Sequence, residues 1–221
     1  MLLAGCGRLA FDAQSARDGD AGAGDGASGD SLSVTCTPDN FSAGAGSTWL
    51  PFTTAAGFNA AFANSQVTVA LPPSSNGYGG IDTIPAYNFS DGRASIEVPT
   101  VVASGNTECY LMVFADANNF YAASYDFGML RMTRRLNGAD LDMVFSYDPV
   151  NDRWWKIEHH ADTNTIEFLT SANGSTWFGR WSVDAAVPIN QMTMEIAAGE
   201  YGGGLVAPGM PVFDNFDLCL P

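Results

Sequence analysis

Short runs of alternating apolar and polar residues recur along the chain from residue 31 onward, with turn-forming residues between them. Side chains of period two lie on opposite faces of a β-strand, so these runs predict strands with one buried face. No long stretch has the 3.6-residue period of a helix. The pattern predicts ten or more strands in an all-β, antiparallel two-sheet sandwich. Strands are expected, among others, at 66–71, 93–98, 108–115, 191–198 and 211–220.

Two Asn-Gly pairs, at 137–138 and 173–174, lie between runs that favour strands. Both central residues of a type I′ turn need positive φ, which Asn and Gly adopt readily. Each pair therefore predicts a hairpin. In the strand predicted after Asn173-Gly174, the two-residue period places Trp177, Trp181 and Val183 on one face. Such a face is more typical of a core than of a ligand platform.

The run RWWKIEHH contains two adjacent tryptophans that must point to opposite faces of a strand. We expect Trp155 and Ile157 to point into the core. Trp154 then shares the outer face with Lys156 and Glu158.

The composition fits one soluble domain with a sizeable core. The chain has 221 residues, 46% of them hydrophobic, and no apolar run long enough to span a membrane as a helix. Its formal net charge is −15, with only 9 Lys and Arg residues. Such a chain repels phosphate backbones and anionic bilayers, so nucleic acid is excluded as an expected partner.

The N-terminal residues 1–6 end in Leu-Ala-Gly-Cys, which resembles a bacterial lipobox, the site whose cysteine becomes lipidated. We therefore expect a lipid anchor on Cys6, a place in the bacterial cell envelope, at the outer membrane or cell surface, and a start codon further upstream. The alternative is an ordinary apolar N-terminus. Residues 7–30, rich in Asp, Gly and Ala, predict a flexible tether, and 31–221 the folded domain.

Three segments together resemble the concanavalin A-like lectins and glucanases, of the laminin-G-like kind. They are YDPVNDRWWKIEHH, TIEFLTSANGSTW and PGMPVFDNFDL, and the resemblance spans about residues 36–220. It implies a jelly-roll sandwich of two curved sheets, whose concave face often binds carbohydrate.

The glucanases of this superfamily carry two Glu and one Asp at alternate positions of one strand. This chain has no such triplet, because its glutamates are scattered along the sequence. No zinc-ligand spacing, nucleophile elbow or phosphate loop occurs either. We therefore expect a carbohydrate-binding or adhesion module without catalytic residues. The alternatives are a divergent glycoside hydrolase with carboxylates from separated strands, or a structural module that binds a protein.

The candidate ligand-binding residues are Trp154, Lys156 and Glu158 on one strand, with Tyr121 and Tyr125 on another. Sugar rings stack on aromatic side chains, and neighbouring charged groups hold the hydroxyls, so the expected partner is a polysaccharide or glycan. The alternative is that these aromatics pack on the surface or against the second sheet.

The jelly-roll resemblance implies that the first and last strands lie side by side. A disulfide between Cys36 and Cys219 is then expected in an exported protein, with Cys109 as a buried thiol. The register through that pair places the segments around Asp39 and Asp214 opposite each other. Their carboxylates predict a structural calcium ion, and the alternative is strand-end aspartates without a metal. No other cofactor is expected.

Overall fold

The computed structural model describes residues 34–221, which form one compact unit of fifteen β-strands without a helix. Among these described residues there is accordingly no helix that could cross a membrane. The strands are β1 (Thr35–Asp39), β2 (Trp49–Thr53), β3 (Asn59–Ala63), β4 (Gln66–Ala70), β5 (Gly77–Thr83), β6 (Arg93–Thr100), β7 (Thr107–Asp116), β8 (Asn119–Asp126), β9 (Met129–Leu136), β10 (Ala139–Ser146), β11 (Trp154–His160), β12 (Thr165–Ser171), β13 (Phe178–Asp184), β14 (Thr193–Glu200) and β15 (Val212–Leu220).

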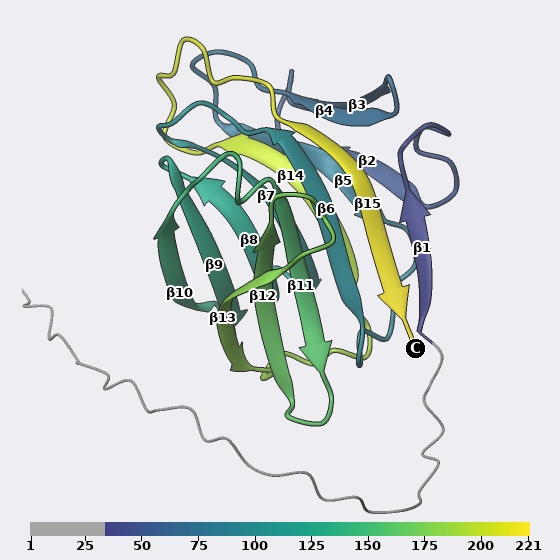
Figure 1. Ribbon diagram of the computed structural model, residues 1–221. Helices are drawn as coiled ribbons and strands as arrows, with labels where there is room; N and C mark the ends of the chain where they lie inside the picture. Colours follow the sequence, from purple (N-terminus) through teal and green to yellow (C-terminus); the bar gives the residue numbers. More distant parts are fainter. Residues whose placement is uncertain (1–33) are drawn as a thin grey trace, which may run out of the picture. The chain divides into compact units, whose positions relative to one another are not determined.

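The strands form two antiparallel sheets stacked as a sandwich (Figure 1). The eight-stranded sheet has the order β13-β12-β11-β6-β15-β4-β3, and β1 also pairs with β15. The seven-stranded sheet has the order β10-β9-β8-β7-β14-β5-β2. The predicted all-β, antiparallel two-sheet sandwich is confirmed.

The core lies between the sheets and follows the period-two pattern. On β11, Trp155 and Ile157 are fully buried, as predicted. The Trp155 indole Nε1 donates a hydrogen bond to the backbone oxygen of Asp152 at 2.8 Å, so its polar atom is satisfied inside the core. On β7, Cys109 and Leu111 are also fully buried.

The two Asn-Gly pairs have different backbone conformations. Asn137 and Gly138 both have positive φ, 52° and 79°, and join the paired strands β9 and β10 directly. This is the predicted tight hairpin. At the second pair only Gly174 has positive φ, 71°, and a longer loop joins β12 to β13. There Asn173 Oδ1 accepts hydrogen bonds from the backbone N–H groups of Ser175 and Thr176, so the side chain organises the loop.

A β-bulge interrupts the pairing of β12 with β13. Phe168 pairs with Trp181, whereas the next residue, Leu169, pairs with Gly179. Arg180 is therefore the extra residue on β13. A bulge of this kind changes which side chains share a face, and it cannot be read from a two-residue period.

The bulge places Trp177 and Trp181 in different environments, so the prediction that they share one core face is wrong. Trp181 stacks on the buried ring of Phe168, with 5.3 Å between the ring centroids. Trp177 instead lies beside the Lys156 ammonium group, which is 4.8 Å from its ring centroid. Trp181 and Val183 therefore pack against the core, as predicted, and Trp177 does not.

The first and last strands lie side by side, β1 in purple and β15 in yellow in Figure 1. Cys36 and Cys219 are direct partners in this pairing and form a disulfide, as predicted. Cys109 is a buried free thiol, also as predicted, and burial raises the pKa of this thiol to about 12.

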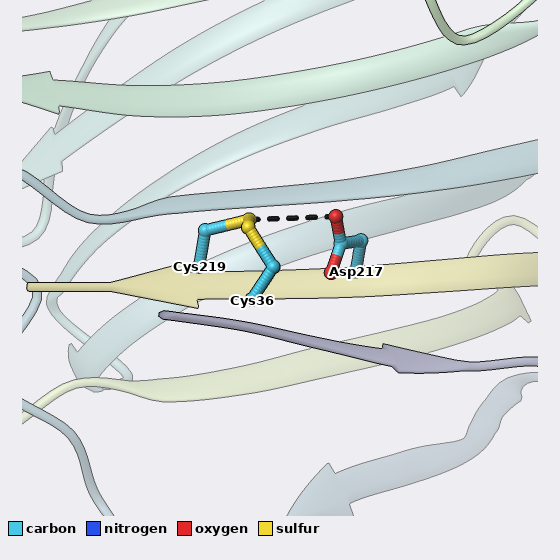
Figure 2. A group of neighbouring side chains, drawn as sticks. All are labelled: Cys36, Asp217 and Cys219. Carbon is cyan, nitrogen blue, oxygen red and sulfur yellow. Dashed lines mark hydrogen bonds between the residues drawn. A yellow bond between two sulfur atoms is a disulfide. The ribbon is translucent and has the colours of Figure 1, made fainter. Parts of the chain in front are cut away.

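The Asp217 carboxylate lies beside the disulfide, with Oδ2 3.4 Å from the Cys219 sulfur (Figure 2). Within residues 34–221, Cys36, Asp217 and Cys219 form the one group of three potential metal ligands that lie close together. Because the two sulfurs are bonded to each other, they are not available as thiolate ligands.

The lipobox at Cys6, the tether at 7–30 and the predicted domain start at residue 31 lie outside the described residues. These remain predictions from the sequence.

Candidate functional site

The solvent-facing side of the seven-stranded sheet contains a cleft with a volume of about 770 Å³. All seven strands and several adjoining loops contribute side chains to it. The lining residues are Phe52, Thr54, Tyr78, Glu108, Tyr110, Met112, Ala117, Phe120, Ala122, Ser124, Asp126, Phe127, Arg131, Thr133, Arg135, Asp140, Asp142, Glu195 and Tyr201.

The pleat of each strand determines which residues reach the cleft. On β7, Glu108, Tyr110 and Met112 line it, while the intervening Cys109 and Leu111 are buried in the core. One run of sequence thus supplies both a core face and a site face.

Aromatic side chains form part of the cleft wall. The ring of Tyr78 lies against the backbone of Gly199 on the neighbouring strand, where a Cβ atom would clash with the ring. Glycine at this position therefore allows the ring to lie close to the sheet. The centroid of the Tyr110 ring is 6.4 Å from that of Tyr78. At another part of the cleft, the rings of Phe127 and Tyr201 meet edge to face at 5.9 Å.

Two carboxyl groups face each other across β14 and β5. Glu195 is the direct cross-strand partner of Asp82, and its Oε1 accepts a hydrogen bond from the Tyr110 hydroxyl at 2.5 Å. Burial, together with the adjacent Asp82 carboxylate, raises the pKa of Glu195 to about 8. Burial also raises the pKa of Asp82. At neutral pH one proton is therefore held between the two carboxyl groups.

A second acidic pair joins β7 and β8. Glu108 is the direct partner of Asp126, and both line the cleft. Glu108 Oε1 accepts a hydrogen bond from the Tyr78 hydroxyl at 2.7 Å, and Asp126 Oδ1 accepts one from Tyr201 at 2.5 Å. Burial raises the pKa of Glu108, and the charge of Asp126 adds to the effect.

The two arginines of the cleft are already paired with carboxylates. Arg131 contacts Asp126 at 3.2 Å and Asp142 at 2.8 Å. Arg135 donates two hydrogen bonds to Asp140, at 2.6 and 2.7 Å. Their positive charges therefore neutralise carboxylates on β8 and β10 and leave Glu108 and Glu195 with phenol partners.

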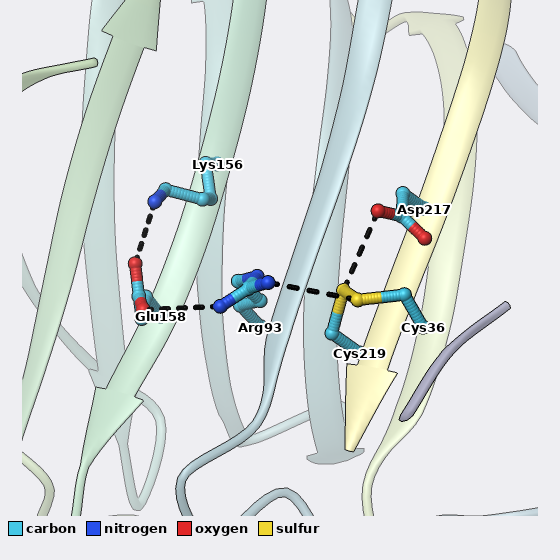
Figure 3. Close-up of a disulfide and its surroundings, with 6 residues drawn as sticks. All are labelled: Cys36, Arg93, Lys156, Glu158, Asp217 and Cys219. Atoms are coloured by element: carbon cyan, nitrogen blue, oxygen red, sulfur yellow. Dashed lines mark hydrogen bonds and ion pairs between the residues drawn. A yellow bond between two sulfur atoms is a disulfide. The ribbon is translucent and has the colours of Figure 1, made fainter. Parts of the chain in front are cut away.

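The structure brings together three of the five side chains that the sequence predicted for ligand binding, on the outer face of the eight-stranded sheet. Lys156 Nζ lies 2.6 Å from Glu158 Oε2, and Glu158 is 4.0 Å from Arg93 (Figure 3). Trp154 is half-buried on the same strand and packs against Gly174 of the loop after β12. This group faces away from the cleft, and its role in binding stays a prediction.

The other two predicted side chains are not on an exposed face. Tyr121 is fully buried in the core, and its hydroxyl accepts a hydrogen bond from the backbone N–H of Val187 at 3.0 Å. Tyr125 is 8% exposed and packs edge to face on Tyr147. The prediction that Tyr121 and Tyr125 present an outer polar face is wrong, because a buried phenol can satisfy its hydroxyl within the protein.

The carboxylates of Asp39 and Asp214 stabilise strand ends. Asp39 accepts hydrogen bonds from the backbone N–H of Phe41 and from Trp49 Nε1. Asp214 accepts them from Gln66 Nε2 and from its neighbour's backbone N–H. Each of the four carboxylate oxygens thus already accepts a hydrogen bond. The structural calcium ion stays a prediction that these contacts do not support.

Tyr78, Glu108, Tyr110 and Glu195 were not among the site residues predicted from the sequence. For β7 a signal was present, because Glu108 and Tyr110 alternate with the apolar Cys109 in ECYLMVFA. The meeting of β5, β7 and β14 in one sheet was needed to show that these side chains share a cleft.

Comparison with known proteins supports the fold assignment. No family model matches the sequence, and no curated protein matches it significantly. Among solved structures, an endo-β-1,3-glucanase from Pyrococcus furiosus superposes with a TM-score of 0.61 at 8% identity, covering 83% of this chain and 92% of that one. A glycoside hydrolase family 16 endo-glucanase from Bacteroides ovatus gives 0.58 at 10% identity, covering 83% and 99%.

A legume lectin-like domain from Entamoeba histolytica gives a TM-score of 0.54 at 7% identity, covering 78% of this chain and 89% of that one. Glucanases and lectin-like proteins thus share the architecture seen here. The chain has a concanavalin A-like jelly-roll fold, as its sequence segments indicated.

Proposed function

We propose that the chain binds a carbohydrate in the cleft of the seven-stranded sheet. The observation that carries the proposal is the cleft itself, because tyrosine and phenylalanine rings and hydrogen-bonding carboxylates line one continuous hollow of about 770 Å³. Stacked rings and charged acceptors are the groups that hold sugar faces and hydroxyls. The fold shared with glucanases and a lectin-like domain is consistent with this proposal.

The proposal is tested with a glycan array on the purified chain, followed by calorimetric titration of the best ligands. Tyr78→Ala removes a ring from the cleft and should weaken binding about tenfold or more, as truncation of an interface aromatic commonly does. Tyr78→Phe keeps the ring and should retain most of the affinity. Trp154→Ala is the matched control, because this ring lies on the opposite sheet.

Three results would contradict the proposal. The first is a chain that binds no glycan. The second is a folded Tyr78→Ala variant that binds every ligand as the wild type does. The third is a loss of binding with Trp154→Ala alone, which would move the site to the outer face of the eight-stranded sheet.

A second candidate function is glycoside hydrolysis in the same cleft. One observation favours it: the pKa of Glu195 is raised to about 8, so this carboxyl group is protonated at neutral pH as a general acid must be. Glu108, on the adjacent strand, is a second carboxyl group in the cleft. Release of reducing sugars from β-glucans that is abolished by Glu195→Gln would establish it. Tight binding without any release would reject it.

Anchoring in the cell envelope is a separate part of the proposal. Its support is the lipobox-like Leu3-Ala4-Gly5-Cys6 and the tether-like composition that follows, together with a disulfide between Cys36 and Cys219. Disulfides persist in oxidising compartments outside the cytosol. A lipid-anchored module with an exposed cleft would hold a glycan at the cell surface.

A further inference from the structure

The charge of the cleft is unbalanced. Five carboxyl-bearing residues and two arginines line it, and the lining set contains no lysine or histidine. Both arginines are occupied by ion pairs with Asp126, Asp140 and Asp142. The remaining two carboxyl groups, those of Glu108 and Glu195, have tyrosine hydroxyls as their hydrogen-bond partners. An anionic ligand would meet repulsion here, and a cation would meet acceptors.

The acidic groups are also placed where they oppose each other. Glu108 faces Asp126 across β7 and β8, and Glu195 faces Asp82 across β14 and β5. Like charges at directly opposite positions of a sheet are destabilising. At the Glu195 pair the shared proton leaves a single negative charge, and at the Glu108 pair Arg131 offsets the charge of Asp126. Each pair therefore keeps negative charge that a ligand cation can offset.

The second pair has few donors around it. Asp82 Oδ1 is buried and has no N–H or hydroxyl partner within the described part of the chain, which leaves the proton shared with Glu195 as its donor. An ammonium group supplies three further donors. Tyr78 and Tyr110 lie beside the two acidic pairs, so an aromatic ring is available next to each position where a cation is favoured.

We propose that the cleft binds an oligosaccharide of amino sugars whose amino groups are unacetylated and protonated. The proposal rests on the glycan-binding function above and names the chemical class of its ligand. The sugar rings contact the tyrosines, and the ammonium groups approach the Glu108 and Glu195 pairs. Neutral oligosaccharides leave both pairs uncompensated, and uronic or sulfated ones add negative charge to the cleft.

The test compares oligosaccharides of equal length that carry positive, neutral or negative charge. The purified chain is titrated in a calorimeter with a glucosamine hexasaccharide and with the N-acetylglucosamine hexasaccharide of the same linkage, at about pH 6, where the amine is protonated. A cello-oligosaccharide and an oligogalacturonate of equal length complete the set. The glucosamine ligand should bind at least about tenfold more tightly than its acetylated counterpart, since charge-assisted hydrogen bonds replace neutral ones.

Variants then assign the effect to the acidic pairs. Glu108→Gln removes one negative charge from the cleft and keeps the side-chain shape, so it should weaken binding of the glucosamine ligand more than binding of the acetylated ligand and thereby reduce the preference between them. Asp82→Asn removes the charge that remains beside the protonated Glu195 and should have the same effect. Asp184→Asn removes an exposed carboxylate from β13 of the other sheet and should change the binding of neither ligand. Thermal melts of each variant confirm that the fold is retained.

The results separate this proposal from the one on which it rests. If neutral or uronic oligosaccharides bind as tightly as the glucosamine ligand, the cleft binds glycans but does not select amino sugars, and this inference is wrong. The inference also fails if Glu108→Gln and Asp82→Asn leave the preference intact. If none of the oligosaccharides binds and the glycan array is also negative, the proposed function itself fails.

Discussion

Glu195 and Asp82 lie directly opposite each other on β14 and β5, and the Tyr110 hydroxyl donates to Glu195 at 2.5 Å. Two carboxyl groups on directly paired residues cannot both ionise without strong repulsion. The pair consequently retains a proton at a pH where exposed carboxyl groups have lost theirs. This makes the cleft less negative than its composition suggests at neutral pH, and more negative in alkaline solution.

The stability of the protein should depend on pH through Glu195. Its pKa rises from an ordinary 4.5 to about 8 in the folded chain, so the unfolded chain releases this proton at lower pH than the folded chain does. The free energy of unfolding should therefore fall as the pH rises between these two values. Glu195→Gln removes this contribution, and urea denaturation should show the variant gaining stability relative to the wild type between about pH 5 and pH 8.

Asp184→Asn, which changes an exposed carboxyl group on β13, is the control and should show little such gain. A difference between Glu195→Gln and the wild type that stays constant with pH would show that Glu195 ionises normally in the folded protein.

The adjacent tryptophans of β11 should differ sharply in their effect on stability. Trp155 is fully buried and hydrogen-bonded, so Trp155→Ala should lower the free energy of unfolding by about 3 to 5 kcal/mol. Trp154 is half-buried on the outer face, and Trp154→Ala should cost about 1 kcal/mol or less. Chemical denaturation of both variants measures the two values. Equal losses would mean that the outer ring is as much a part of the packing as the inner one.

Loss of the disulfide should lower stability without changing the pairing of the other strands. Cys36 and Cys219 are 183 residues apart in the sequence, and closing so long a loop restricts the unfolded chain. In the loop-entropy model, Cys36→Ser with Cys219→Ser should lower the free energy of unfolding by roughly 4 to 5 kcal/mol. Non-reducing peptide mapping should recover the Cys36 to Cys219 peptide, with Cys109 alkylated only after unfolding. A Cys36 to Cys109 peptide would contradict the β1 to β15 register.

The lipid anchor can be tested by metabolic labelling in a bacterial host. With an upstream signal sequence supplied, a palmitate analogue should label the wild-type chain through Cys6 and should not label Cys6→Ser. Both proteins should be exported equally, as judged by their disulfide. Equal labelling of the two would show that Cys6 carries no lipid.

Much of the architecture could be predicted from the sequence, because the signals were local. The period-two pattern places Trp155 and Ile157 in the core, and Asn137-Gly138 predicts a tight hairpin. The disulfide followed from the end-to-end arrangement of the fold. Where the local signal was ambiguous the prediction failed: in FYAASY either phase of the alternation offers aromatic side chains, and the phase containing Tyr121 proved to be the buried one.

The cleft could not be predicted, because its residues meet only through strand pairing across long sequence separations. Glu195 is 113 residues from its partner Asp82 and shares a hydrogen bond with Tyr110 on a third strand, 85 residues away. The bulge between β12 and β13 could not be predicted from the sequence either, because the alternation of apolar and polar residues does not mark Arg180 as an extra residue. A search for acidic residues at alternate positions of one strand overlooks carboxyl groups that face each other across two strands.

The bond between Cys36 and Cys219 also determines how the domain would bear mechanical load. The thirteen strands from β2 to β14 all lie within the loop that this bond closes, and β1 and β15 hold its two ends. Tension applied between residue 34 and the C-terminal Pro221 would pass through the sulfur atoms rather than through the sheets. Pulling on the oxidised protein by its ends would extend a few residues at most, and the cleft would keep its shape under forces that peel apart an unbridged sandwich.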